Sequence, residues 1–220
     1  MRKGIFITFE GGEGCGKSTQ SLLLFKLLKK KGYKLIHTRE PGGTKFSEAV
    51  RRIILDPKSR ITPVAELFLY ETARVQHIAD VILPALKAGK TVICDRFTDA
   101  TVAYQGYGRG LDLSMINQLN TVAACGLKPD LTIYLDIPPE TGLSRARGIK
   151  KDFKKACDRL EGEALSFHKR VRKGYLALAA KESSRIKVIR TAETIEETFA
   201  AVSKIVLDRI GRTKIQRRGA

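Results

Sequence analysis

The residues best suited to chemistry lie in one glycine-rich stretch near the N-terminus. They follow the phosphate-loop pattern, which is GxxxxGK and then Ser or Thr. Glycines let consecutive backbone N–H groups turn toward phosphate oxygens, and the helix that follows adds the positive end of its dipole. In such a loop Lys17 reaches the outer phosphates and Ser18 binds a magnesium ion. The sequence therefore predicts a nucleoside triphosphate site formed by Gly11, Gly12, Glu13, Gly14, Cys15, Gly16, Lys17, Ser18 and Thr19.

The patterns around this loop supply the strand and the helix that it needs. A buried strand is expected before the loop and an amphipathic helix after it, closed by Gly32. Strand-like and helix-like patterns then alternate to the end of the chain, which is typical of a parallel sheet with helices on both faces. We expect an α/β, three-layer phosphate-loop NTPase fold with strands at 4–9, 33–38, 91–95, 131–136 and 186–190. Helices are expected at 18–31, 44–55, 62–86 with a kink at Pro84, 98–105, 114–125, 140–147, 161–181 and 195–210.

Composition places the chain among single-domain cytoplasmic proteins. A length of 220 residues with 43% hydrophobic content is enough for one buried core and too short for two ordinary domains. No apolar run is long enough to span a membrane, so no membrane partner is expected. The cysteines and histidines form no paired motif, which argues against zinc sites and disulfides; they are Cys15, Cys94, Cys125, Cys157, His37, His77 and His168.

The net charge of +18 is concentrated in two segments. Residues 145–173 carry 11 basic and 4 acidic side chains, and residues 204–220 carry 6 and 1. The first segment lies where an element could close over phosphates, and the second reads as a solvated tail. Either could touch nucleic acid, but a run of charge is more often a soluble surface, and no specific nucleic-acid partner is expected.

In open parallel sheets, ligands bind at the carboxyl ends of the strands. Asp95 and Arg96 directly follow an apolar strand. We predict that Asp95 binds magnesium, directly or through water, and that Arg96 neutralises charge between two phosphoryl groups. A salt bridge at the strand end is the alternative interpretation.

A second set of residues could recognise a nucleobase. Tyr70 and Arg74 are four residues apart on a predicted helix and therefore share one face, so an aromatic plane lies beside a fork of donors. Thr101, Tyr104 and Gln105 show spacings of three and four on the next short helix. Periodicity alone also fits a core tyrosine with an arginine that extends to the surface.

These features together resemble the thymidylate kinases, in particular the bacterial form, over nearly the whole chain. The resemblance rests on several motifs in order: residues 9–14, 38–44, 70–74, 95–97, 103–106, 134–136, 142–148 and 158–161. It implies a nucleoside monophosphate kinase that transfers the γ-phosphoryl of ATP to dTMP, with Mg²⁺, as a homodimer. It also implies a mobile lid at about 145–160, within a single domain of residues 1–211 that is followed by a basic tail, 212–220.

The resemblance also implies roles for individual residues. Tyr70, usually phenylalanine in the family, stacks on thymine, while Arg74 and Thr101 bind the base. Gln105 is assigned to the same substrate site, and Tyr104 crowds the sugar so that a 2′-hydroxyl fits poorly. Glu13 accepts from the 3′-hydroxyl, Arg51 and Arg96 hold the 5′-phosphate, and Arg145 or Arg147 reaches the transferring phosphoryl from the lid.

One departure and two rival functions accompany these expectations. The lid segment 149–157 is longer and richer in lysine than the family pattern, which leaves open which lid cation reaches the phosphoryl group. A kinase for another nucleoside monophosphate would use the same phosphate chemistry with a different base pocket. A nucleic-acid-stimulated ATPase would use the basic surplus, but the chain has no second acidic residue beside Asp95 to activate water.

Overall fold

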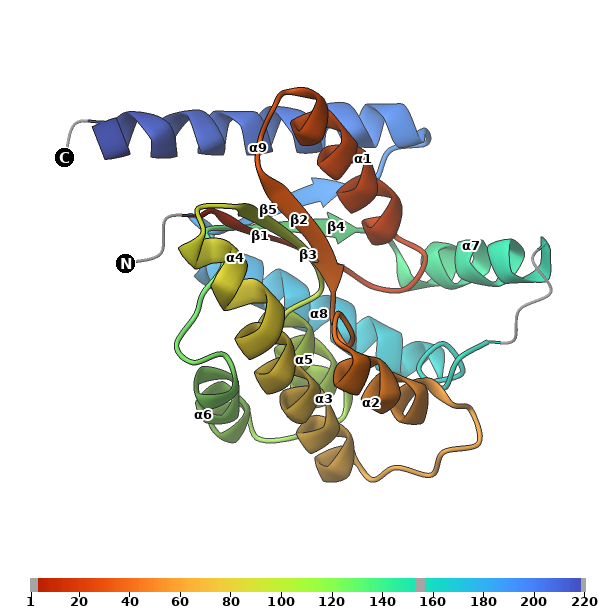
Figure 1. Cartoon of the computed structure of the whole chain (residues 1–220). Helices are drawn as coiled ribbons and strands as arrows, with labels where there is room; N and C mark the ends of the chain where they lie inside the picture. The colour runs from red at the N-terminus through yellow and green to blue at the C-terminus, as the bar shows by residue number, and fades with distance from the viewer. Residues whose placement is uncertain (1–3, 153–156, 219–220) are drawn as a thin grey trace.

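Five parallel strands form the centre of the molecule, in the order β2-β3-β1-β4-β5 (Figure 1). The computed structural model describes residues 4–152 and 157–218. Within these ranges it describes the side chains of residues 4–148 and 157–211. The strands are β1 (Phe6–Glu10), β2 (Leu35–Arg39), β3 (Thr91–Asp95), β4 (Leu131–Asp136) and β5 (Ile186–Arg190). The predicted five-stranded parallel sheet is confirmed.

Helices cover both faces of this sheet, and the strands β1, β3 and β4 are therefore buried at every position. On one face Ile7 and Phe9 pack with Leu24 of α1 (Lys17–Lys30) and Val202 of α9 (Ile195–Arg218). On the other, Phe6 packs with residues of the long helical region that ends in α4 (Leu83–Lys87). Figure 1 shows α1 and α9 on one side of the strands, and α3 (Pro63–His77), α4 and α8 (Leu165–Lys181) on the other. The three predicted layers are therefore present.

Two predicted helices contain π-helical turns. The long helix is α3 and α4, joined by the π-helical segment Ile78–Ile82, which ends just before Pro84. Pro84 has no N–H and its ring crowds the carbonyl four residues earlier, so the wider π turn accommodates it where the sequence predicted a simple kink. The helix expected at 98–105 is a single turn, α5 (Thr98–Thr101), followed by the π-helical segment Val102–Gly108.

Other helix boundaries also differ from the prediction. The helix expected from residue 161 begins at Leu165, since the Asp158 carboxylate accepts the N–H groups of Leu160 and Glu161 and holds this stretch in a turn. The remaining helices are α2 (Lys45–Leu55), α6 (Leu113–Ala123) and α7 (Pro139–Asp152). Helix α9 continues to Arg218, past the predicted end at residue 210, while the tail's side chains from 212 onward lie outside the described set. No helix in the described ranges has the length and hydropathy of a membrane span.

Candidate active site

The phosphate loop connects β1 to α1 with the geometry that its glycines predict. Gly14 and Gly16 have φ values of 65° and 89°, in the left-handed region that glycine adopts without strain. Gly16 is the N-cap of α1, and Lys17 is its first residue. The Lys17 ammonium donates to the carbonyl oxygen of Gly12 at 2.7 Å, so it lies over the loop. Cys15 is buried behind the loop, and burial raises the pKa of its thiol.

An oxygen pair suited to magnesium lies at the start of α1. The Ser18 hydroxyl donates to Oδ2 of Asp95 at 2.5 Å, which brings the end of β3 to the phosphate loop. Hydroxyl and carboxylate oxygens are the ligands that Mg²⁺ prefers, and it keeps several waters and substrate phosphates as its other ligands. The described residues contain no group of three or more His, Cys, Asp or Glu side chains arranged to hold a metal ion. The donor set therefore fits an ion shared with a nucleotide and does not fit a closed protein site.

Glu13, Arg96 and Tyr104 form a polar cluster beside the loop. Arg96 Nη2 donates to Glu13 Oε1 at 2.8 Å and to the Tyr104 hydroxyl at 2.9 Å. Tyr104 in turn donates to the same carboxylate oxygen at 2.6 Å, and the guanidinium carbon lies 4.7 Å from the centre of its ring. Burial opposes ionisation of Glu13, but Arg96 and Lys17 outweigh it and lower its pKa to about 2. Arg96, directly after β3, thus forms a salt bridge with Glu13 of the phosphate loop.

Arg96 is also hydrogen-bonded to Tyr175, which in turn is hydrogen-bonded to Glu10. Its backbone has a φ of 72°, uncommon for a residue with a side chain. Its Nη1 donates to the Tyr175 hydroxyl at 3.2 Å, and that hydroxyl donates to Glu10 Oε2 at 2.8 Å. Glu10 also accepts the backbone N–H of Phe97 at 2.7 Å. Burial and the nearby Asp99 raise the pKa of Glu10 to about 8, although Arg96 opposes the change.

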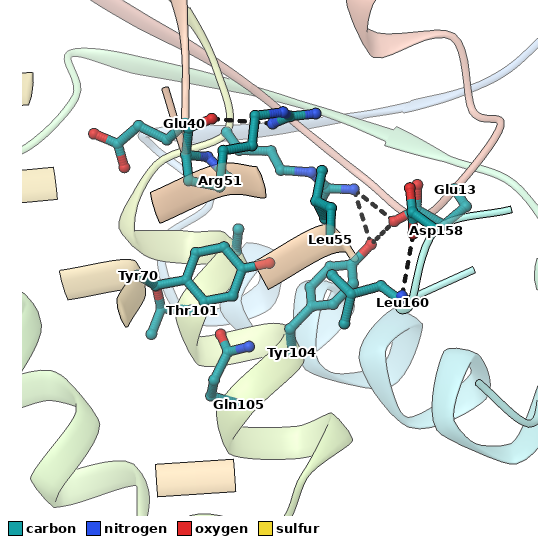
Figure 2. Close-up of a pocket in the computed structure, with 13 residues that line it drawn as sticks. Glu13, Glu40, Arg51, Leu55, Tyr70, Thr101, Tyr104, Gln105, Asp158 and Leu160 are labelled. Atoms are coloured by element: carbon teal, nitrogen blue, oxygen red, sulfur yellow. Dashed lines mark hydrogen bonds and ion pairs between the residues drawn. The ribbon is translucent and has the colours of Figure 1, made fainter. Parts of the chain in front are cut away.

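A pocket opens from this cluster toward α3. It contains about 480 Å³ of empty space, open solvent included. Figure 2 shows Glu13 on one side of the pocket and Tyr70, Thr101 and Gln105 on the other. The structure thus brings together most of the predicted substrate residues, since the lining comprises Glu13, Glu40, Pro41, Arg51, Leu55, Tyr70, Arg96, Ala100, Thr101, Tyr104, Gln105, Asp158 and Leu160.

Arg74 lies behind this lining, with 2% of its surface exposed. Its guanidinium donates to Glu40 at 2.8 Å and to both oxygens of Glu71 at 2.8 and 2.9 Å. It also donates to Asn120 at 2.8 Å and, through Nη2, to the Thr101 hydroxyl at 2.9 Å. The predicted alternative of an arginine extending to the surface is wrong, because buried carboxylates pair with it. Its contact with the pocket runs through Thr101, whose hydroxyl hydrogen is left to donate.

The upper wall of the pocket in Figure 2 carries a cation, Arg51. Its Nη1 donates to the carbonyl oxygen of Pro41 at 3.0 Å. Burial and then the nearby Arg39 lower the pKa of Arg51. Arg39 itself pairs with Glu48, while Arg96 pairs with Glu13. An anion placed between Arg51 and Arg96 would relieve this concentration of positive charge.

Helix α7 packs directly on the phosphate loop. A Cβ at Gly14 would overlap the carbonyl oxygen of Gly142, and a Cβ at Gly142 would overlap that of Glu13. The backbone nitrogen of Ala146 is also close to Gly14. Arg145 and Arg147 flank this contact and are exposed. The lid predicted at 145–160 lies only partly within the described residues, since residues 153–156 and the side chains of 149–156 are outside them.

Several residues that line or support the site were not predicted. Glu40 directly follows β2 and pairs with Arg74 and His77. Glu66 is wholly buried and pairs with Arg109 and Arg159. A carboxylate among apolar residues of a helix was the available signal for Glu66. Asp136, at the carboxyl end of β4, accepts two hydrogen bonds from Arg172 and one from Tyr134, and so joins α8 to β4.

Comparisons with known proteins agree with this geometry. The profile of the family described as Thymidylate kinase matches residues 9–202. A thymidylate kinase of Geobacter sp. (strain M21) is 52% identical over 94% of this chain and 93% of its own length, and that of Gloeobacter violaceus is 48% identical over 92% and 94%. The crystal structure of thymidylate kinase from Ehrlichia chaffeensis superposes with a TM-score of 0.74 at 35% identity, covering 92% of this chain and 98% of that one. The chain therefore belongs to the thymidylate kinase family.

Proposed function

We propose that the protein is an ATP-dependent kinase that phosphorylates dTMP to dTDP, with ADP as the second product. The observation that carries the proposal is a single pocket lined by both Glu13 of the phosphate loop and the aromatic ring of Tyr70. Such a pocket would hold the acceptor's phosphate next to the donor's. The family assignment supports dTTP biosynthesis as the setting. Four free cysteines suit a reducing compartment, and we propose the cytoplasm.

In this proposal the pocket selects a thymine deoxynucleotide. The Tyr70 ring stacks on the base, and Thr101 and Gln105 hydrogen-bond to its edge, with Arg74 acting beside Thr101. Tyr104 is fixed by its bonds to Glu13 and Arg96, so it cannot move aside for a 2′-hydroxyl. Glu13 keeps its charge at neutral pH and accepts from the 3′-hydroxyl.

Catalysis would consist of alignment and neutralisation of charge. The acceptor is an anionic phosphate oxygen and needs no general base. Lys17 and the loop amides bind the ATP phosphates, Arg51 and Arg96 bind the 5′-phosphate of dTMP, and a lid arginine completes the set. Ser18 and Asp95 would hold Mg²⁺, which supplies further neutralisation of phosphate charge when bound.

We further propose that the protein is a homodimer. Each copy would be a single domain, with a lid at the carboxyl ends of the sheet strands. Val64, Phe68 and Val75 lie along α3 with 45%, 52% and 46% of their surfaces exposed, an apolar stripe that a second copy would cover. The lid is assigned to about 145–160. Gly142, three residues before this range on α7, packs against the loop that would hold ATP. Residues 1–211 would form the domain and 212–220 a basic tail.

The test is a comparison of initial rates with Mg-ATP and five acceptors: dTMP, UMP, CMP, dGMP and AMP. We expect dTMP to react fastest, and Lys17→Ala to abolish the reaction with every acceptor. Failure to convert dTMP while another nucleotide is phosphorylated would assign a different substrate. ATP hydrolysis that needs DNA and no nucleotide acceptor would favour the ATPase.

A further inference from the structure

Glu66 is a buried carboxylate that joins the base pocket to the turn at residues 158–161. It lies on α3, one turn before Tyr70, and none of its surface is exposed. Its Oε2 accepts from Arg109 at 3.0 Å and from Arg159 at 2.5 Å. Arg159 stands between Asp158 and Leu160, which line the pocket. Burial opposes ionisation, but hydrogen bonds from Arg109 and Gln105 outweigh it and lower the pKa of Glu66.

The other oxygen of Glu66 fixes the orientation of a base-recognition side chain. Gln105 Nε2 donates to Glu66 Oε1 at 2.7 Å, and both side chains are buried. Because Glu66 is ionised it can only accept, so a Gln105 carboxamide turned by 180° would place two acceptor oxygens against each other. Figure 2 shows the Gln105 oxygen on the side of Tyr70 and Thr101. The pocket therefore receives an acceptor from Gln105, next to the hydroxyl donor of Thr101.

We propose that Glu66 is a positioning residue for base selectivity: it locks the Gln105 carboxamide with its oxygen toward the base. The inference rests on the proposed function. A thymine ring offers a donor at N3–H beside an acceptor at O4, which matches an acceptor at Gln105 and a donor at Thr101. A cytosine ring offers an acceptor at N3 beside an amino donor, the reverse pattern. Selectivity against cytosine thus depends on a carboxylate that touches no substrate.

The experiment compares kcat/KM for dTMP and dCMP in wild-type protein and in Glu66→Gln. A glutamine at 66 can either donate to Gln105 or accept from it, so both carboxamide orientations become available. We expect the ratio of kcat/KM values, dTMP to dCMP, to fall about ten- to hundredfold. Glu66→Asp, which keeps the charge beside Arg109 and Arg159 but withdraws from Gln105, should lower the same ratio with less loss of stability.

Glu163→Gln is the matched control. Glu163 pairs with the same Arg109 as Glu66, whereas the Gln105 amide donates to Glu66, so this variant should weaken the ion-pair network and leave the ratio within about twofold of wild type. The proposal is overturned if folded Glu66 variants keep the wild-type ratio, or if Glu163→Gln lowers it equally.

Wild-type protein supplies a further test if both Glu66 variants fail to fold. N3-methyl-dTMP has no donor at N3, so its kcat/KM should fall by at least tenfold relative to dTMP. Equal use of the methylated nucleotide would overturn the proposed orientation of Gln105. Loss of dTMP conversion by wild-type protein would instead refute the proposed function, so the two failures are distinguishable.

Discussion

Replacing Glu10 by glutamine should make the stability of the protein less dependent on pH. The pKa of this buried carboxyl rises from 4.5 to about 8 on folding, chiefly because burial disfavours its charge. Between these two values the folded state holds a proton that the unfolded state has released. Raising the pH through this window therefore lowers the free energy of unfolding of the wild-type protein.

The size of the effect follows from the two pKa values. At about 1.4 kcal/mol per tenfold change in proton concentration, the loss is capped near 5 kcal/mol. From pH 6 to pH 8 the wild type should lose about 2 kcal/mol through Glu10. Glu10→Gln has no proton to release and still offers an oxygen to the N–H of Phe97. Relative to wild type, the variant should thus gain about 2 kcal/mol over this interval.

The assay is urea unfolding of both proteins at half-unit steps from pH 6 to pH 8. The difference between their free energies of unfolding cancels other titrating groups, including the histidines. Glu13→Gln is the control, because the low pKa of Glu13, about 2, keeps it ionised throughout, so its effect on stability should not change with pH. Parallel curves for wild type and Glu10→Gln would refute the reasoning.

Three further predictions concern the lid and the buried network. Arg147→Ala should lower kcat by about 10²-fold or more in steady-state assays, and unchanged turnover would move the role to Arg145 or a lid lysine. Gly14→Ala should displace α7 and lower kcat about 10²-fold, because Gly14 has a φ of 65° and a Cβ there would overlap Gly142. Gly148→Ala, on α7, meets open space and should leave kcat unchanged. Arg74→Ala should lower the urea unfolding free energy by about 3 to 5 kcal/mol, because it leaves the buried carboxylates of Glu40 and Glu71 without their cation. The loss should be smaller at acidic pH, where Glu71, whose pKa burial already raises, takes up a proton.

The fold was predictable wherever local pattern decides structure. The glycine pattern of residues 11–16 predicts the loop between β1 and α1, because Gly11, Gly14 and Gly16 adopt positive φ values that favour glycine. The strand order was not predicted, since it depends on pairs such as Phe6 with Val92 that lie far apart in sequence. The start of α8 was wrong because a side-chain turn at Asp158 competes with the helix.

The candidate site shows the same division. Helical spacing correctly predicts that Tyr70 and Arg74 share a face, but it cannot show that Arg74 turns to Glu40, which is 34 positions away in the chain. The sequence does not predict the role of Glu66, because its partners, Arg109 and Arg159, lie in two later segments of the chain. Sequence motifs thus indicate the groups that meet substrate, whereas the residues that orient those groups emerge only from tertiary contacts.

The central place of β1 in the sheet affects how the protein acquires activity during synthesis. This strand pairs with β3 on one side and β4 on the other, and the N–H of Phe6 donates to Asp130, 124 positions later. The phosphate loop is synthesised early, whereas β3 and β4, which flank β1 in the sheet, leave the ribosome much later. A nascent chain shorter than about 131 residues keeps one edge of an apolar strand open, and premature termination in this region should yield aggregation-prone fragments without nucleotide affinity.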